Sequence, residues 1–165
     1  MPTLYLVRHA IAADRGDAWP DDDLRPLTHE GMARMRAGVA GLRAMGVTFD
    51  AVLASPLVRA RQTADLLVED LRPKLAVIES PALAPGRAPA EIARALSEAG
   101  GRASVALVGH EPDLGELAAW LIGAQTPLVF KKGGVCCIEC ENPVHAGGGT
   151  LQWLALPKML RALGK

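Results

Sequence analysis

Short apolar runs alternate along the chain with longer segments in which apolar residues recur every three or four positions. The short runs predict buried strands and the longer segments predict amphipathic helices, and their alternation is typical of an α/β domain. We predict strands at Thr3 to Val7, Ala51 to Ala54, Ala76 to Ile78, Ser104 to Val108, Val135 to Glu141 and Thr150 to Leu156.

Start and stop signals place four helices between these strands. The first has Thr28 as its N-cap and ends at Gly46, and the second is expected to start at Ser55-Pro56, where a capping residue precedes a proline. The other two are expected at Pro89 to Ala99 and from Pro112 to Gly123.

No helical pattern separates the last two strands. The connecting stretch Glu141 to Gly149 (ENPVHAGGG) is rich in turn residues and predicts a hairpin, so this final pair is antiparallel. The expected fold is an α/β, three-layer α/β/α sandwich. Its central sheet of about six strands is mostly parallel with an antiparallel C-terminal edge, and helices cover both faces.

The composition fits one domain over residues 1–165, because half of the residues are hydrophobic and supply a core. Eighteen basic residues balance eighteen acidic ones, so the zero net charge gives no reason to expect nucleic acid or a membrane as a partner. No signal-type segment precedes the first strand, and no apolar run is long enough to span a bilayer. We therefore expect a cytoplasmic protein.

Three cysteines, Cys136, Cys137 and Cys140, lie in one strand-like run. Their odd number and close spacing do not suggest a disulfide framework. A zinc site would need further ligands at matched spacing, and only His145 lies nearby. We expect these cysteines to be structural, and we expect no metal or other cofactor.

Histidine and arginine side chains follow three of the predicted strands. They are Arg8 and His9 after the first, Arg59 on the helix after the second, and His110 after the fourth. In an open α/β sheet, ligands bind beyond the carboxyl ends of the strands, close to helix N-termini whose free N–H groups favour an anion. The sequence therefore predicts an anion site at this edge of the sheet.

These residue types suit phosphoryl transfer. The planar guanidinium of arginine can hold phosphate oxygens bidentately and keeps its charge at any relevant pH. Nearby arginines disfavour imidazolium, which leaves a histidine nitrogen free to attack phosphorus. In this scheme His9 forms a phosphohistidine intermediate, and water then releases inorganic phosphate.

Three motifs carry a resemblance to a known family. They are VRHA near the N-terminus, SPLVRARQTA from Ser55 to Ala64, and LVGHEP from Leu107 to Pro112. Together, and in this order, they resemble the histidine phosphatase superfamily, the phosphoglycerate-mutase-like enzymes.

The resemblance implies a role for each of four residues. It makes His9 the nucleophile, gives phosphate binding to Arg8 and Arg59, and has His110 bind and stabilise the transferring group. These four are the catalytic and phosphate-binding residues that we expect.

Within the superfamily, the chain looks most similar to the small SixA-type phosphohistidine phosphatases. This resemblance covers nearly the whole chain, and besides the three motifs it includes RPLT (Arg25 to Thr28) at the first helix and LQWLALP (Leu151 to Pro157) as the last strand. Larger branches insert a cap over small substrates, and we expect no cap domain here. An open site suits a side chain presented by another protein. The implied partner is a phosphorylated protein, such as a phosphorelay histidine domain, with a small phosphorylated molecule as the alternative.

Many superfamily members carry a carboxylate after the third strand that protonates the leaving oxygen. The corresponding stretch here, Pro81 to Pro89 (PALAPGRAP), has none. An alkoxide leaves poorly without an acid, whereas imidazole, with a conjugate-acid pKa of roughly 6.5, departs with little help. The missing acid therefore favours phosphohistidine as substrate, and Glu111 or Asp113 remains an alternative proton donor.

Other polar residues are candidates for supporting contacts. Ser55 and Glu111 lie within the second and third motifs. Arg25 either reaches the pocket or substrate or pairs with the acidic run Asp21 to Asp23. That run is expected to be a solvated loop. Arg61 points elsewhere on its helix than Arg59 does, so we expect it on the surface.

Three functions follow in order of preference. The first is a metal-independent phosphohistidine phosphatase acting on a protein. The second is a phosphomonoesterase or mutase of the same superfamily that acts on small molecules. The third is a non-catalytic module that binds phosphate or a phosphoprotein, and it is disfavoured because binding alone needs no nucleophile.

Overall fold

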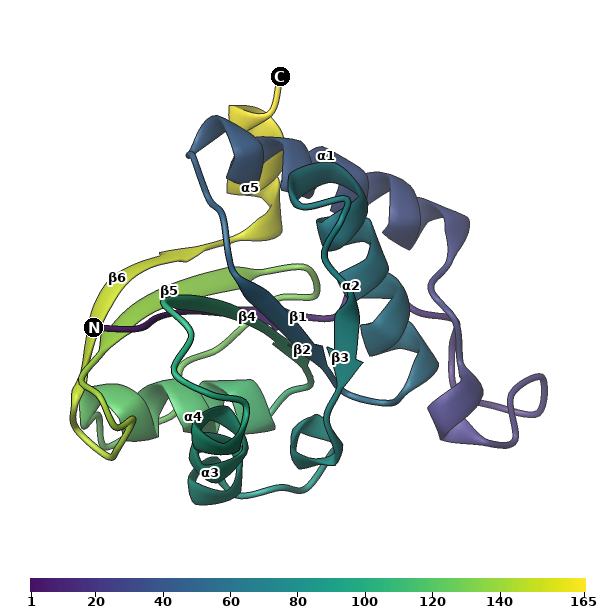
Figure 1. The fold of residues 1–165 in the computed structure, drawn as a ribbon. Helices are drawn as coiled ribbons and strands as arrows, with labels where there is room; N and C mark the ends of the chain where they lie inside the picture. The colour runs from purple at the N-terminus through teal and green to yellow at the C-terminus, as the bar shows by residue number, and fades with distance from the viewer.

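Six strands form one central sheet in the order β3-β2-β4-β1-β5-β6, in a computed structural model that describes all residues from Met1 to Lys165 (Figure 1). The strands are β1 Thr3–Arg8, β2 Ala51–Ala54, β3 Val77–Glu79, β4 Ser104–Gly109, β5 Val135–Cys140 and β6 Gly149–Ala155. Each strand boundary lies within one residue of its predicted position.

The pairing of the strands agrees with the predicted fold class. Strands β3, β2, β4 and β1 are parallel to one another. Strand β5 runs antiparallel to β1, and β6 runs antiparallel to β5. The prediction of a mostly parallel sheet with an antiparallel C-terminal edge is confirmed.

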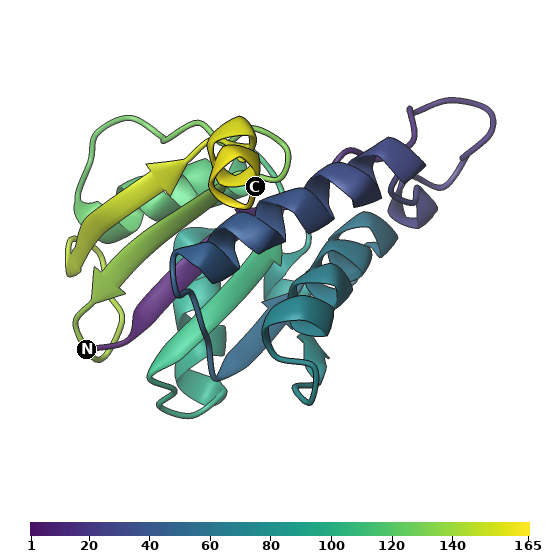
Figure 2. The same ribbon diagram turned by 90° about the horizontal axis from the view of Figure 1, so that it is seen from above.

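Helices cover both faces of the sheet (Figures 1 and 2). One face carries α1 His29–Ala44, α2 Val58–Leu71 and α5 Pro157–Leu163, and the other carries α3 Pro89–Glu98 and α4 Asp113–Ile122. Two short 3-10 helices, η1 Asp22–Leu24 and η2 Pro81–Leu83, lie in the connections. None of the helices has the length and apolar character needed to cross a membrane.

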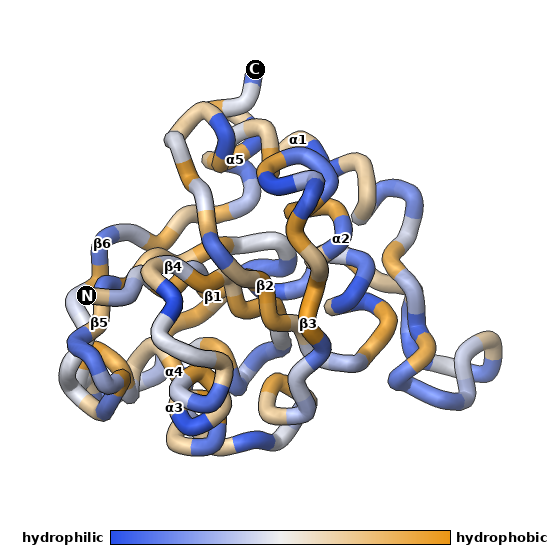
Figure 3. The backbone as a smooth tube through the Cα atoms, viewed as in Figure 1, coloured by the Kyte–Doolittle hydropathy of each residue, from blue (hydrophilic) through white to orange (hydrophobic).

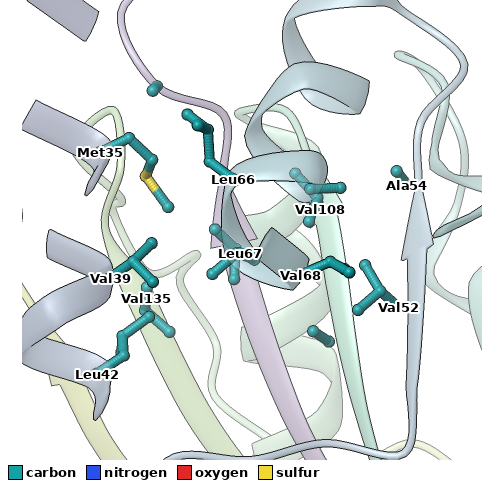
Figure 4. Packing of buried hydrophobic residues seen from close by; sticks show 14 of the residues in the cluster. Met35, Val39, Leu42, Val52, Ala54, Leu66, Leu67, Val68, Val108 and Val135 are labelled. Atoms are coloured by element: carbon teal, nitrogen blue, oxygen red, sulfur yellow. The ribbon is translucent and has the colours of Figure 1, made fainter. Parts of the chain in front are cut away.

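Each face of the sheet has its own hydrophobic core, as expected for parallel strands that are apolar on both sides. On one side Val39 of α1 and Leu67 of α2 pack with Val108 of the sheet (Figure 4). On the other side Leu117 of α4 packs with Leu107. The central strands β1, β2 and β4 are largely hydrophobic along the backbone trace (Figure 3). This double core holds the strand ends, where the predicted site lies, in a fixed arrangement.

The predicted starts of α1, α3 and α4 are confirmed, and the predicted start of α2 is wrong. The Thr28 hydroxyl accepts a hydrogen bond from the Gly31 N–H at 2.9 Å, which confirms Thr28 as the N-cap of α1. Gly46, in the left-handed conformation with φ of 77°, follows the end of this helix. The predicted start at Ser55 is wrong, because α2 begins at Val58 and the Ser55 hydroxyl has other partners, described below.

Helix α5 was not predicted, because its seven residues are too few to show a periodic apolar face. It crosses α1 closely at Gly41 (Figure 2). A Cβ atom at Gly41 would collide with the carbonyl oxygen of Leu160. The absence of a side chain at Gly41 is therefore what allows the two helices to approach so closely.

Replacing Gly41 by alanine should destabilise the protein by about 1–3 kcal/mol, the usual range for overpacking. Gly38 is the matched control on the same helix, since its Cβ would meet the Cβ of Leu160 at an ordinary 3.8 Å. Gly38→Ala should leave the stability unchanged or raise it, because alanine is the better helix former. Urea unfolding of both variants measures the difference, and equal stabilities would contradict this account of the crossing.

Candidate active site

Strands β1, β2 and β4 are parallel, so their carboxyl ends lie at the same edge of the sheet. The register pairs Arg8 of β1 with Gly109 of β4, which brings His9 and His110 side by side. The His9 N–H donates to the Gly109 carbonyl at 3.0 Å, and the two imidazole centroids are 5.3 Å apart. The ends of neighbouring parallel strands thus join two histidines that are far apart in the sequence.

A cavity of about 360 Å³ opens at this edge. Four of its lining residues are the predicted catalytic and phosphate-binding residues, and two more, Arg25 and Glu111, were predicted as supporting contacts. The lining residues are Arg8, His9, Ala12, Asp14, Arg15, Asp22, Arg25, Arg59, Pro85, His110, Glu111 and Lys132.

The His9 ring is buried and held by its backbone. Its Nδ1 lies 2.7 Å from the Ala10 carbonyl oxygen, which can only accept, so Nδ1 carries the proton and Nε2 carries the lone pair. Burial lowers the pKa of His9 to about 4 against the opposing effect of the Ala10 hydrogen bond, and the charges of Arg59 and Arg8 lower it further. The ring is therefore neutral at physiological pH. The expected effect of the arginines is present, but burial is the larger cause.

His110 is held by Ser55. Its Nε2 lies 2.8 Å from the Ser55 hydroxyl, which also accepts a hydrogen bond from the Leu57 N–H at 3.2 Å. These two partners explain why Ser55 does not cap α2. The Nδ1 atom of His110 is buried without a hydrogen-bond partner, which leaves it available to a ligand. Burial, followed by the neighbouring His9 and Arg59, lowers the pKa of His110 to about 3.

Titration of the histidine rings by NMR should separate these two from an exposed histidine. His9 and His110 should stay neutral as the pH falls from about 8 to about 5.5, because their pKa values lie near 4 and 3. His145 should protonate above the usual value of 6.5, since its hydrogen bond to Glu141 raises its pKa.

The same shifts set a stability trend. Both buried histidines have pKa values lowered from the usual 6.5, so in this pH range the unfolded chain binds more protons than the folded protein. The free energy of unfolding should therefore fall as the pH drops from about 6.5 to about 4. A midpoint near 6.5 for either buried ring would contradict the description of the site.

Arg8 is positioned by the segment that precedes β5. Its Nη1 donates to the Phe130 carbonyl at 2.7 Å, while its Nε is buried without a partner. The Glu111 carboxylate accepts from the Phe130 N–H at 3.2 Å and from the Gly115 N–H at 2.7 Å. Glu111 therefore fixes the backbone that holds Arg8, and both of its carboxylate oxygens are occupied.

Arg59 lies in the first turn of α2 and is only 3% exposed. Its Nη1 donates to the Asp22 carbonyl at 2.7 Å and its Nη2 to the Asp22 carboxylate at 3.0 Å, while its Nε is buried without a partner. The Thr63 hydroxyl accepts from the Ala10 N–H at 3.0 Å and donates to the Arg59 carbonyl at 2.8 Å. Thr63 thereby ties the helix that carries Arg59 to the segment after His9.

The Asp22 side chain of the acidic run is 42% exposed, so this residue is solvated as expected, but it also forms ion pairs at the edge of the cavity. Its carboxylate pairs with Arg25 at 2.8 Å, Arg59 at 3.0 Å and Arg15 at 3.4 Å. Two alternatives were predicted for Arg25, and the structure shows both: Arg25 pairs with Asp22 of the acidic run, and it lines the cavity. Arg61 forms ion pairs away from the cavity and lies on the surface, as expected.

Sequence reasoning missed several lining residues, among them Asp14, Arg15 and Lys132. Asp14 and Arg15 follow within five residues of the first motif. This closeness to His9 in the sequence is the signal that could have identified them as lining residues. Lys132 comes from the loop before β5, where the Gly133 N–H donates to the carbonyls of Arg8 and His9. With five cationic side chains and three carboxylates, the cavity has the net positive charge that an anion requires.

The stretch Pro81 to Pro89, which contains no carboxylate, reaches the cavity only through Pro85. Asp113, one of the two alternative proton donors, accepts from the Gly86 N–H at 2.8 Å and does not line the cavity. Asp14 lines the cavity, and its carboxylate takes part in no hydrogen bond or ion pair. It is the one lining carboxylate that remains free.

The three cysteines are buried and unpaired within β5. Burial raises the pKa of Cys136 to about 12 and the pKa values of Cys137 and Cys140 to about 11. These thiols are therefore protonated and unreactive at physiological pH. No group of three or more histidine, cysteine or acidic side chains gathers in the geometry of a metal site.

Comparison with known proteins places the chain in a family. Residues 4–86 match the model of the histidine phosphatase superfamily, branch 1. The chain is 30% identical to the phosphohistidine phosphatase SixA of Escherichia coli, over 97% of this chain and 99% of that protein. It is 42% identical to an uncharacterized protein of Picosynechococcus, over 80% of this chain and 81% of that protein.

Solved structures show the same fold. The protein histidine phosphatase SixA in complex with tungstate superposes with a TM-score of 0.85 at 28% identity, covering 96% of this chain and 99% of that chain. Phosphoglycerate mutase from Bacillus anthracis shares the fold, with a TM-score of 0.73 at 16% identity over 99% of this chain and 96% of that chain. The chain therefore belongs to branch 1 of the histidine phosphatase superfamily.

Proposed function

We propose that this protein is a phosphohistidine phosphatase that removes phosphate from a phosphorylated histidine of another protein. One observation carries the proposal: a neutral, backbone-oriented His9 shares one cavity with Arg8, Arg59 and His110. The similarity to SixA of Escherichia coli supports it. So does the tungstate bound in a SixA structure, because tungstate is a tetrahedral oxyanion like phosphate.

The first step transfers the phosphoryl group to the enzyme. The lone pair on His9 Nε2 forms a bond to phosphorus while the N–P bond of the substrate breaks, and the substrate imidazole leaves and takes up a proton. Arg8 and Arg59 neutralise the charge on the phosphoryl oxygens. The Ser55 hydroxyl donates to His110 Nε2 in this scheme, so His110 Nδ1 carries the proton and donates to one of these oxygens. These side chains supply the needed charge without a metal ion.

The second step returns His9 to its starting state. Water attacks the phosphorus of phospho-His9, the N–P bond breaks, and inorganic phosphate forms with loss of a proton from the water. His9 leaves with its electron pair and is again neutral. The hydrogen bond from Nδ1 to the Ala10 carbonyl keeps the ring in one orientation through both steps.

The leaving group favours phosphohistidine over a phosphate ester. Imidazole leaves with little acid assistance, whereas an alkoxide needs a proton donor near the leaving oxygen. The stretch Pro81 to Pro89 presents only Pro85 to the cavity, and the carboxylate of Glu111 is held by two backbone N–H groups. These surroundings therefore favour a substrate whose leaving group needs little help from a general acid.

A substrate comparison tests the proposal. With a chelator present, the protein is incubated with a histidine-phosphorylated phosphotransfer domain, a sugar phosphate and an aryl phosphate, and phosphate release is measured for each. We expect kcat/KM for the phosphoprotein to exceed that for either ester by about 10² or more. Turnover of the esters alone would overturn the proposal, and phosphate binding without any turnover would indicate a binding module.

Asp14 favours a second candidate, a phosphomonoesterase acting on small molecules. Its side chain lines the cavity and makes no other polar contact, and in its protonated form it would donate a proton to an ester oxygen. If esters are the substrates, Asp14→Asn should lower ester turnover by about 10²-fold. If phosphohistidine is the substrate, the same variant should retain most of its activity on the phosphoprotein.

A further inference from the structure

A second cavity, a groove of about 600 Å³, adjoins the candidate active site. It lies between the N-terminal half of α1, the loop before β5 and the start of α5. The two helices touch where Gly41 meets Leu160, and the groove lies on the N-terminal side of that crossing on α1. Figure 2 shows α5 next to α1.

The groove has an unbalanced charge. Six cationic side chains line it and no carboxylate does: Arg8, Arg34, Lys131, Lys132, Lys158 and Arg161. Only Arg34 has an acidic partner, Glu30, at 2.7 Å. The whole chain carries equal numbers of basic and acidic residues, so composition alone does not explain this clustering. The groove therefore attracts an anionic partner.

The groove also offers apolar contact. Ile11, Met35 and Leu156 line it beside the cations. A small inorganic anion would gain nothing from these side chains, and a nucleic acid would gain little from them. An acidic protein segment that carries an occasional apolar side chain matches both the charge and the apolar surface.

The groove and the active site share Arg8 and Lys132, which line both cavities. The groove is therefore within reach of a substrate protein whose phosphohistidine contacts His9. We propose that the groove docks an acidic segment of the phosphoprotein substrate, next to the phosphohistidine. This inference rests on the proposed function, since it assigns that function's substrate a second contact surface.

Charge reversal of Lys158 and Arg161 tests the docking. Both residues lie outside the catalytic cavity. The double variant Lys158→Glu/Arg161→Glu should raise KM for a histidine-phosphorylated phosphotransfer domain by about tenfold or more with kcat little changed. Turnover of phosphoramidate, a small N-phosphoryl compound, should stay within about twofold of wild type. The matched control is Lys74→Glu/Arg102→Glu, an exposed basic pair away from the groove; it should leave both activities unchanged.

Equal loss for phosphoprotein and phosphoramidate would overturn the proposal, because it would show a general effect on the phosphate site. An unchanged KM for the phosphoprotein would overturn it as well. The same loss in the control variant would show only a dependence on overall charge, and would also contradict a localised groove.

A binding measurement separates this proposal from the proposed function. The probe is a fluorescent, unphosphorylated peptide in which leucines are spaced among glutamates. Its binding is measured by fluorescence anisotropy. Wild type and the control variant should bind it, and Lys158→Glu/Arg161→Glu should weaken binding by about tenfold. If the peptide binds in this way while the phosphoprotein is not hydrolysed, the proposed function fails and the acidic-segment site stands. No peptide binding, or stronger binding of a DNA oligonucleotide at the same residues, overturns the docking proposal whatever the enzymatic result.

Discussion

His9→Ala should lower the rate of phosphate release from a phosphohistidine substrate by at least about 10³-fold. In the proposed mechanism, this variant removes the atom that receives the phosphoryl group, His9 Nε2. The measurement is the initial rate of phosphate release at saturating substrate.

His145→Ala is the matched control for this variant. His145 is exposed, pairs with Glu141 and lies outside the catalytic cavity, so its loss should leave the rate within about twofold of wild type. Near-full activity of His9→Ala, with the fold intact by circular dichroism, would contradict the nucleophilic role of His9.

Arg59→Ala should lower kcat/KM by about 10²–10³-fold, the usual cost of removing one group that stabilises transition-state charge. Inhibition by tungstate or inorganic phosphate should weaken in the same variant, because the guanidinium is expected to contact the bound oxyanion. Arg59→Lys keeps the charge but loses the planar fork, so its activity should lie between those of wild type and Arg59→Ala.

Arg61 provides the comparison on the same helix. It lies two residues further on and pairs with Asp65 and Glu79 on the surface, so Arg61→Ala should retain wild-type kinetics. If both arginine variants lost activity equally, the assignment of phosphate binding to Arg59 would be wrong. Loss of stability rather than of activity in Arg59→Ala would instead indicate that its pairing with Asp22 is mainly structural.

The sheet and the meeting of the two histidines could be predicted because they depend on strong local patterns. The four parallel strands are apolar runs, and polar residues stand directly at the ends of β1 and β4. Parallel strands place their carboxyl ends together, so the order of motifs was enough to bring His9 near His110.

The contacts that orient these residues could not be predicted, because they join segments distant in sequence. Ser55 has the residue type and position of a helix cap, yet its hydroxyl forms a hydrogen bond with His110, 55 residues further along the chain. Asp22 looks like one member of a solvated acidic run, yet it pairs with Arg59 across 37 positions. No local signal distinguishes Asp22 from Asp21 or Asp23.

Short elements and shared surfaces also escaped prediction. Helix α5 has seven residues and shows no periodic pattern, and it supplies one wall of the basic groove. Lys132 stands in a loop whose place is set by backbone hydrogen bonds from Gly133 to Arg8 and His9. Charge clustering of this kind emerges only when the segments are packed together.

The central claim is that a phosphoryl group passes through His9, and rapid-quench labelling tests it most directly. A histidine-phosphorylated protein carrying radioactive phosphate is mixed with excess enzyme, and the reaction is stopped in base, where phosphohistidine survives. We predict that a labelled enzyme forms and decays at rates consistent with turnover, and that peptide mapping places the label on His9. A label on any other residue, or phosphate release with no labelled enzyme at any time, would contradict the account.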